Sequence, residues 1–375
     1  MAVAPSSLIA LVRRFGVHLS PHAAGPLRCY GPGVHVGLLS LGDHLADPVT
    51  GVKVSQARRH RSLVDQAVLA EQLGFRSVHL GEHHFCDYIV SAPPIVLAAI
   101  AERTTTLRLS TGVTLGANLD PVRVAEDYAT VDLLSGGRVE PVIGRGTAFP
   151  HTFGAFGQDV SVARECFDEH VELLVKIWET DGPVTWSGQH RASLDGIEVL
   201  PRPMQTPRPP LWLGAGSRES VELAARLGLW LMLPTVFGTP ELFIPVVDQY
   251  LACWEAAGRD RAAARIGCVS HCHVAATSQE ARATWQPRYT AYMTWVQDLI
   301  ARGMGLTMPP FDFDTTVANL ALCGSPAEVQ HRMGELRELW HLDTHLVMFD
   351  MGGIPEPELH RTITMFGTEV LPTLS

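Results

Sequence analysis

The sequence predicts an α/β fold, a (β/α)8 TIM barrel with insertions. Three observations predict it: eight short apolar segments read as strands, helical segments lie between most of them, and 375 residues are enough for one large barrel. Alternating strands and helices are typical of parallel βαβ units, and eight such units favour a closed barrel. Because the usual barrel has about 250 residues, we expect the excess in residues 1–33, 181–207 and 280–320.

The first half of the barrel is predicted from apolar runs and from the residues that begin and end helices. Gly74 and Gly136 follow helical patterns as stop signals, and Asp120 with Pro121 is a typical helix start. We therefore expect strands at 34–41, 76–83, 107–115 and 138–144. Helices are expected at 61–75, 91–104, 119–137 and 161–179. In the last of these helices, one apolar stripe consists of Phe167, Val171, Leu174 and Trp178.

The second half continues the alternation. Strands are expected at 209–215, 229–234, 265–276 and 344–351, with a helix at 217–228. Residues 285–313 are rich in aromatic residues and methionine and contain prolines. This segment is interpreted either as a substrate lid or as an ordinary barrel helix followed by a loop.

Two parts of the chain differ in composition. Residues 1–33, rich in proline, glycine and small residues, are expected to be an N-terminal extension, and residues 34–375 the barrel domain. The extension is either a genuine arm or a mis-assigned stretch upstream of a true start at Val34.

Composition excludes several classes of protein. A net charge of −10 without a Lys/Arg-rich run argues against nucleic acid as a partner. No apolar run reaches the roughly 18 residues that a membrane span needs, and the charges near the N-terminus follow the apolar patch, unlike a secretory signal. Seven scattered cysteines without a CxxC pair favour reduced thiols. We expect a cytoplasmic enzyme.

Candidate chemistry collects after three predicted strands, in the segments 81–85 (GEHHF), 144–146 (GRG) and 214–220 (GAGSRES). Barrel active sites lie at the carboxyl ends of the strands, so these segments are expected to converge. A metal site at Glu82, His83 and His84 is disfavoured because neighbouring strand residues point to opposite faces and no HExxH spacing is present.

Two further motifs allow more than one interpretation. Ser217 and Ser220 at the start of a helix, with Arg145 nearby, form a candidate phosphate site, although a simple capped helix explains the serines equally well. His271 and His273 lie on one face of a predicted strand, where structural or solvent-facing roles are preferred to a metal site.

Five motifs in the same order give the chain a resemblance to the bacterial luciferase-like flavin monooxygenases, over residues 34–374. They are LGFRSVHLGEHHF, LRLSTGVTLGANLDPVRVAEDYATVDLLSGGRVEPVIGRG, FGAFGQDVSVARECFDEHVELLVKIWE, VLPRPMQTPRPPLWLGAGSRES and the C-terminal GSPAEVQHRM with HLVMFDMGGIPEPELHRTITMFGTEVLPTL. The family is a (β/α)8 barrel, in agreement with the strand count. Gly144 and Gly216 depart from the luciferase pattern, which has a cysteine and an acidic residue there, so light emission is not implied.

The resemblance also implies roles for individual residues. His83 resembles the catalytic base, whereas two satisfied core histidines are the alternative for the 83–84 pair. His84 is expected to stabilise the strand end or line the back wall of the site. The implied cofactor-binding positions are Glu82 beside the flavin ring, Gly112 and Val113 at an unusual peptide bond under the ring, and Arg145, Ser217 and Ser220 at the phosphate; no metal is implied.

The implied activity is that of an FMN-dependent monooxygenase. Reduced FMN, supplied by a partner NAD(P)H:flavin reductase, would react with O2, and one oxygen atom would pass through a flavin C4a-(hydro)peroxide to a small apolar aldehyde, ketone or polyketide-like substrate. The family is usually dimeric, so a homodimer is expected. Two alternatives stay open: an F420-dependent oxidoreductase that transfers hydride, and a non-catalytic flavin-binding protein.

Overall fold

A computed structural model describes residues 33–147, 149–305 and 310–374 of the chain. The chain divides into two units, Met1–Gly31 and Pro32–Ser375. The account below concerns the second unit. The predicted extension at 1–33 lies outside the described residues except for Gly33, so its boundary stays a prediction.

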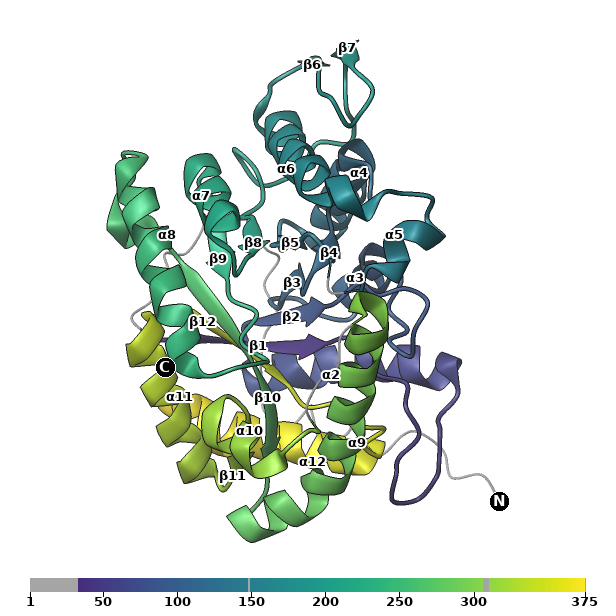
Figure 1. The fold of residues 1–375 in the computed structure, drawn as a ribbon, viewed down its shortest axis with the longest axis vertical. Helices are drawn as coiled ribbons and strands as arrows, with labels where there is room; N and C mark the ends of the chain where they lie inside the picture. The colour runs from purple at the N-terminus through teal and green to yellow at the C-terminus, as the bar shows by residue number, and fades with distance from the viewer. Residues whose placement is uncertain (1–32, 148, 306–309, 375) are drawn as a thin grey trace, which may run out of the picture. The chain divides into compact units, whose positions relative to one another are not determined.

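A parallel barrel sheet forms the centre of this unit (Figure 1). Its hydrogen-bonded path runs β3-β2-β1-β12-β10-β9-β8-β5-β4, and all of these pairs are parallel. The strands are β1 His35–Ser40, β2 Ser77–Leu80, β3 Arg108–Thr111, β4 Thr114–Leu115, β5 Val142–Gly144, β8 Trp212–Gly214, β9 Trp230–Met232, β10 Ile266–Val274 and β12 Thr344–Met348.

The two ends of this path meet in one predicted strand. The segment expected at 107–115 is broken after Thr111 into β3 and β4, which stand at opposite ends of the path. The eight predicted strand positions therefore account for the whole circuit, and the predicted (β/α)8 barrel is confirmed.

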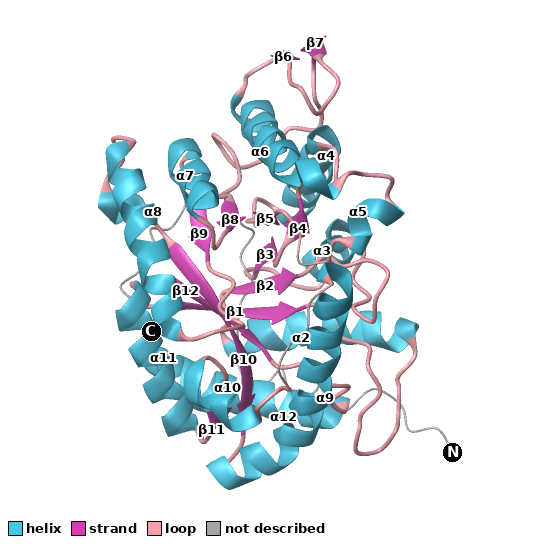
Figure 2. Ribbon diagram, viewed as in Figure 1, coloured by secondary structure: helices cyan, strands magenta, loops and turns pink. Residues whose placement is uncertain are grey.

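Helices surround the sheet (Figure 2). They are α2 Gln56–Leu73, α3 Pro93–Ala101, α4 Pro121–Ser135, α5 His151–Ala155, α6 Ala163–Glu179, α7 Arg218–Leu227, α8 Ile244–Ala256, α9 Ser278–Met304, α10 Phe313–Asn319, α11 Pro326–Trp340 and α12 Glu356–Met365. Short 3-10 or π turns lie at Val160–Val162, Pro240–Phe243, Arg261–Ala263, Phe366–Val370 and Leu371–Thr373.

The predicted helix ends are confirmed. The Asp120 side chain accepts a hydrogen bond from the Val122 backbone N–H at 2.9 Å, which satisfies a free donor in the first turn of α4. Gly74 and Gly136 end α2 and α4 with φ of 89° and 70°, a conformation that glycine adopts without steric cost. The stripe predicted for α6 is fully buried, since Phe167, Val171, Leu174 and Trp178 are at most 2% exposed.

The insertions carry additional elements. Within 181–207, β6 Val184–Trp186 and β7 Leu194–Ile197 form an antiparallel hairpin. Within and after 280–320, the long helix α9 is followed by α10 and by β11 Leu322–Gly324, which pairs with the end of β10. One apolar cluster joins inward-facing strand residues such as Leu39, Val142 and Leu346 to Trp285 and Tyr292 of α9. Helix α9 therefore packs against the barrel interior.

Candidate active site

A cavity of about 530 Å³ opens at the carboxyl ends of the barrel strands. Its size is in the range of small-molecule and cofactor sites. Parallel strands bring their carboxyl ends to the same face of a barrel, so residues far apart in sequence meet here. All seven predicted site residues line this cavity: Glu82, His83, Gly112, Val113, Arg145, Ser217 and Ser220.

Glu82 uses both carboxylate oxygens within the protein. Oε2 accepts a hydrogen bond from the Leu115 backbone N–H at 3.0 Å, and Oε1 lies 2.9 Å from Nε2 of His84. The Glu82 backbone N–H donates to the Val113 carbonyl at 2.9 Å. Glu82 thus fixes the segment around Val113. His84 contacts Glu82 at the strand end and does not line the cavity, in agreement with the first of its two expected roles.

The peptide bond between Gly112 and Val113 is cis, as the resemblance implies. The side chain of Val113 is packed against two glycines on neighbouring strands. A Cβ atom at Gly144 would lie 2.5 Å from Val113 Cγ2, and one at Gly214 would lie 3.0 Å from Val113 Cγ1. A side chain at position 144 would therefore collide with Val113, and one at position 214 would press against it.

His83 is held between aromatic rings. Its ring centroid lies 4.5 Å from that of Tyr88 and 5.0 Å from that of Phe149. Its Nδ1 atom is buried and finds no hydrogen-bond partner in the described part of the chain. Burial lowers the pKa of His83 to about 4. The imidazole is therefore neutral near pH 7 and keeps a lone pair that accepts a proton.

The cavity lining also holds one cationic side chain and two hydroxyl groups. Arg145 lines the cavity, as do Ser217 and Ser220, whose hydroxyls lie 3.1 Å apart at the start of α7. Burial and the neighbouring Arg164 lower the pKa of Arg145. Within the described residues no carboxylate lies within ion-pair distance of the Arg145 guanidinium. The positive charge of Arg145, the two hydroxyls and the N-terminus of α7 are the kinds of group that bind a phosphate.

Sequence reasoning missed several residues that line the cavity. Tyr88, Phe149 and Tyr292 form an aromatic wall next to His83. His271 also lines the cavity, and its Nδ1 atom shares a hydrogen bond with the Tyr289 hydroxyl at 2.8 Å. The aromatic content of 285–313 pointed to Tyr292, whereas no sequence pattern marked Tyr88 or Phe149.

The solvent-facing role considered for His271 and His273 is wrong. Their exposed fractions are 5% and 0%, because both faces of β10 are covered, one by α9 and the other by the outer helices. Burial lowers the pKa of His271 to about 3 and that of His273 to about 4. The ring of His273 is stacked 6.1 Å from that of Trp285, so this histidine is structural.

Other features bear on the class of protein. No group of three or more histidine, cysteine, aspartate or glutamate residues is arranged to hold a metal ion within the described ranges. No described helix is both long enough and apolar enough to cross a membrane. The six cysteines that the structure describes are free thiols.

Comparison with known proteins identifies the family. The family model for luciferase-like monooxygenases matches residues 34–341. The chain therefore belongs to the luciferase-like monooxygenase family. A curated relative, the oxygenase component of the flavin-dependent trigonelline monooxygenase of Acinetobacter baylyi, is 26% identical over 47% of this chain and 50% of that protein. The chain spans about half the length of several curated relatives that it matches.

Solved structures share the fold. The monooxygenase RslO1 from Streptomyces bottropensis has a TM-score of 0.80 and 28% identity, over 91% of this chain and all of that chain. The oxygenating constituent of the 3,6-diketocamphane monooxygenase of Pseudomonas putida, a type II Baeyer–Villiger enzyme in complex with FMN, has a TM-score of 0.73 and 19% identity over 92% and 99% of the chains. An F420-dependent secondary alcohol dehydrogenase is similar, with a TM-score of 0.70 and 19% identity over the same shares.

Proposed function

We propose that the protein is an FMN-dependent monooxygenase that transfers one oxygen atom from O2 to a small, uncharged apolar substrate such as a ketone, an aldehyde or a polyketide-like molecule. Membership of the luciferase-like monooxygenases supports the reaction class. The FMN complex of a structural neighbour supports the cofactor. A relative named as an oxygenase component supports a separate NAD(P)H:flavin reductase as the partner that supplies reduced FMN.

The observation that carries this proposal is the distribution of charge in the cavity. Glu82 and Arg145 are the only carboxylate and guanidinium groups among the described residues that line it. Both carboxylate oxygens of Glu82 are already hydrogen-bonded, to Leu115 and His84. If Arg145 binds the FMN phosphate, neither charged group of the lining is available to pair with a charged substrate. This arrangement supports an uncharged substrate.

The residues fit FMN at both ends. A phosphate group would be held by Arg145, Ser217 and Ser220 at the N-terminus of α7. A flat ring system would rest on the Gly112–Val113 peptide, since both residues line the cavity. When bound in its reduced form, FMN supplies the two electrons that reduce O2, so that one oxygen atom enters the substrate and the other leaves as water.

His83 is the proposed proton-transfer residue. His83 lines the cavity together with Gly112 and Val113, so its ring lies within reach of a ligand bound there. A neutral imidazole accepts a proton from a ligand and returns it later in the reaction, as a general acid–base residue must. The second histidine of the cavity, His271, is already hydrogen-bonded to Tyr289.

The aromatic wall excludes water from the reacting centre. Tyr88 and Tyr292 are 3% and 2% exposed, and Val296 and Ile300 extend the apolar lining along α9. A dry cavity favours transfer of oxygen to the substrate over release of hydrogen peroxide. Residues 285–304 of the segment 285–313 belong to α9, which agrees with the barrel-helix interpretation, and residues 306–309 lie outside the described residues.

The test is an anaerobic titration with reduced FMN and, in parallel, with reduced F420, followed by O2 and a panel of cyclic ketones and aldehydes. We expect reduced FMN to bind. When the O2 is labelled with a heavy oxygen isotope, we expect the label to appear in a product. Binding of F420 alone, with hydride transfer and no oxygen uptake, would move the protein to the F420-dependent oxidoreductases. Binding of flavin without turnover on any substrate would favour the non-catalytic alternative. The proposed homodimer is tested on the same preparation by sedimentation.

A further inference from the structure

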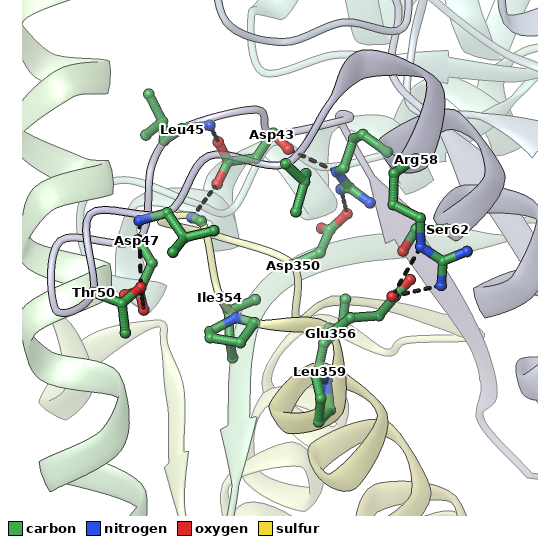
Figure 3. Close-up of a pocket in the computed structure, with 16 residues that line it drawn as sticks. Asp43, Leu45, Asp47, Thr50, Arg58, Ser62, Asp350, Ile354, Glu356 and Leu359 are labelled. Carbon is green, nitrogen blue, oxygen red and sulfur yellow. Dashed lines mark hydrogen bonds and ion pairs between the residues drawn. The ribbon is translucent and has the colours of Figure 1, made fainter. Parts of the chain in front are cut away.

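A second cavity, of about 420 Å³, lies in the segments that follow β1 and β12 (Figure 3). It is enclosed by the loop 41–55 after β1, the first turns of α2, and the segment that joins β12 to α12. Among the described residues, none lines both cavities. Its volume is sufficient for a small organic molecule.

The floor of this cavity holds a buried carboxylate with one unused oxygen. Asp350 is 4% exposed, and its Oδ2 accepts hydrogen bonds from Arg59 and from the Ser40 hydroxyl. Its other oxygen, Oδ1, is buried and accepts no hydrogen bond from the part of the chain that the structure describes. Buried carboxylate oxygens nearly always have a donor. The missing donor is therefore expected to come from outside the chain.

The lining has an excess of negative charge. It contains four carboxylates and two guanidinium groups, from Asp43, Asp47, Asp350, Glu356, Arg58 and Arg59. Arg58 pairs with Glu356, Arg59 with Asp350, and Asp47 with a residue outside the lining, Arg288. The Asp43 carboxylate accepts hydrogen bonds from the backbone N–H groups of Leu45 and Gly353. Asp43 is thus the one lining carboxylate without an ion-pair partner among the described residues, so the cavity favours a cation.

The walls above this floor are apolar and fixed in place. They are formed mainly by Leu45, Val52, Val54, Ile354, Pro355 and Leu359. Gly353, with φ of 65°, packs so closely that a Cβ there would lie 2.5 Å from the backbone of Ala46 and Asp47. Asp47 is also joined to Arg288 of α9 by an ion pair at 3.0 Å. The cavity is therefore preformed, which lowers the entropic cost of binding.

We propose that this cavity is a second small-molecule site, which takes an organic cation with a primary ammonium group and a short apolar arm. The ammonium group donates a hydrogen bond to Oδ1 of Asp350, and the arm lies against the valine and leucine side chains of the walls. A carboxylate ligand is repelled, and a neutral alcohol of the same length keeps the apolar contacts but loses the charge-assisted hydrogen bond.

The experiment measures binding of three probes, n-hexylammonium, hexan-1-ol and hexanoate, to the full chain saturated with FMN, by calorimetry and ligand-observed NMR. We expect the ammonium probe to bind at least about tenfold more tightly than the alcohol, the ratio that one charge-assisted hydrogen bond supplies. We expect no binding of hexanoate. Equal affinity for the ammonium and the alcohol, or preference for hexanoate, would overturn the proposal.

Three variants assign the location. Val54→Trp fills the mouth of the cavity from a wall residue that is 42% exposed, and Val49→Trp is its control, since Val49 is 59% exposed on the same loop and does not line the cavity. V54W is expected to lose the ammonium probe and V49W to retain it. Asp350→Asn should weaken the ammonium at least about tenfold and leave the alcohol unchanged. If D350N fails to fold without its ion pair to Arg59, the comparison of V54W with V49W still tests the location of the site. Equal binding of the ammonium probe by these two variants would contradict the proposed location.

Discussion

The hydroxyl groups of Tyr88 and Tyr292 lie 2.7 Å apart and share a hydrogen bond inside the protein. Tyr88 belongs to the segment after β2 that also carries His83, and Tyr292 belongs to α9. The ring of Tyr88 also contacts His83 at 4.5 Å and Trp295 at 4.7 Å between centroids. This pair therefore attaches the long helix to the strand end that bears the proposed proton-transfer residue.

Removing one hydroxyl of this pair is expected to destabilise the fold. Tyr292→Phe leaves the Tyr88 hydroxyl buried without its partner, which costs about 1–3 kcal/mol in the free energy of unfolding. Replacing both tyrosines by phenylalanine removes both polar groups, so the double variant should lose less than the sum of the two single losses. A double-mutant cycle by urea unfolding measures this difference. Strictly additive losses would show that the two hydroxyls do not depend on each other.

The proposed phosphate site at Arg145, Ser217 and Ser220 predicts a selective effect on flavin binding. Arg145→Ala should weaken FMN binding by about 1.5–3 kcal/mol, the contribution of a hydrogen bond to a charged group, and should leave riboflavin binding almost unchanged because riboflavin lacks the phosphate. Fluorescence titration with both flavins checks this.

The matched control for that experiment is Arg164→Ala. Arg164 is a neighbouring arginine that lies 3.6 Å from Glu219 and does not line the cavity. R164A is expected to bind both flavins nearly as the parent protein does. If R145A weakens FMN and riboflavin equally, the phosphate is bound elsewhere.

The fold and the meeting of the predicted site residues were predictable from sequence for physical reasons. Alternation of apolar strands and helices leaves few topologies, and parallel strands bring their carboxyl ends to one face. His83, Arg145 and Ser217 each follow a strand, so their convergence requires only the barrel. Local rules also located helix ends, as at Asp120, because a capping side chain acts within its own turn.

The remaining cavity residues depend on packing that no local pattern encodes. Tyr292 reaches the site because α9 lies against the barrel interior. A helical pattern in the sequence does not tell against which part of the barrel the helix packs. His271 was assigned a structural or solvent-facing role because alternation along a strand separates two faces without telling which one lines a site, and both faces of β10 are buried. Asp350 and Val54 meet in the second cavity through two loops, whose conformations follow from tertiary contacts.

Buried histidines predict that stability falls on mild acidification. Burial lowers the pKa of His79 to about 4 and those of His271 and His345 to about 3. Between these values and the ordinary pKa of 6.5, the unfolded chain binds protons that the folded chain does not, so the free energy of unfolding decreases as the pH falls through this window. Each such histidine contributes on the order of 1.4 kcal/mol per pH unit.

One buried carboxylate acts in the opposite direction. Burial raises the pKa of Asp43 from 3.8 to about 6, so the folded chain binds its proton more readily and gains stability as the pH falls through that range. Because several histidines lower the free energy of unfolding as the pH falls and only this aspartate is considered to raise it, the free energy of unfolding should still decrease on acidification. Urea unfolding at a series of pH values from neutral to mildly acidic measures the slope. A free energy of unfolding that stays constant or rises on acidification would contradict the neutral, buried state of these histidines.

The proposed role of His83 predicts uncoupling of oxygen reduction from product formation. His83→Ala should bind FMN nearly as the parent protein does, since Arg145 and the two serines hold the phosphate, but it removes the group that exchanges a proton with the ligand. It also opens a space for water beside the Gly112–Val113 floor. We therefore expect reduced FMN and O2 to give mainly hydrogen peroxide, measured by a peroxidase-coupled assay beside product yield.

The control for this variant is His84→Gln, which retains a donor for Glu82 and does not line the cavity. H84Q should keep both product yield and low peroxide release. The pH dependence adds an independent check: because burial lowers the pKa of His83 to about 4, its neutral form persists under mildly acidic conditions, and the product yield should not fall near pH 6.5, where an exposed histidine becomes protonated. A product yield for H83A equal to that of the parent protein would show that the proton is transferred by another group.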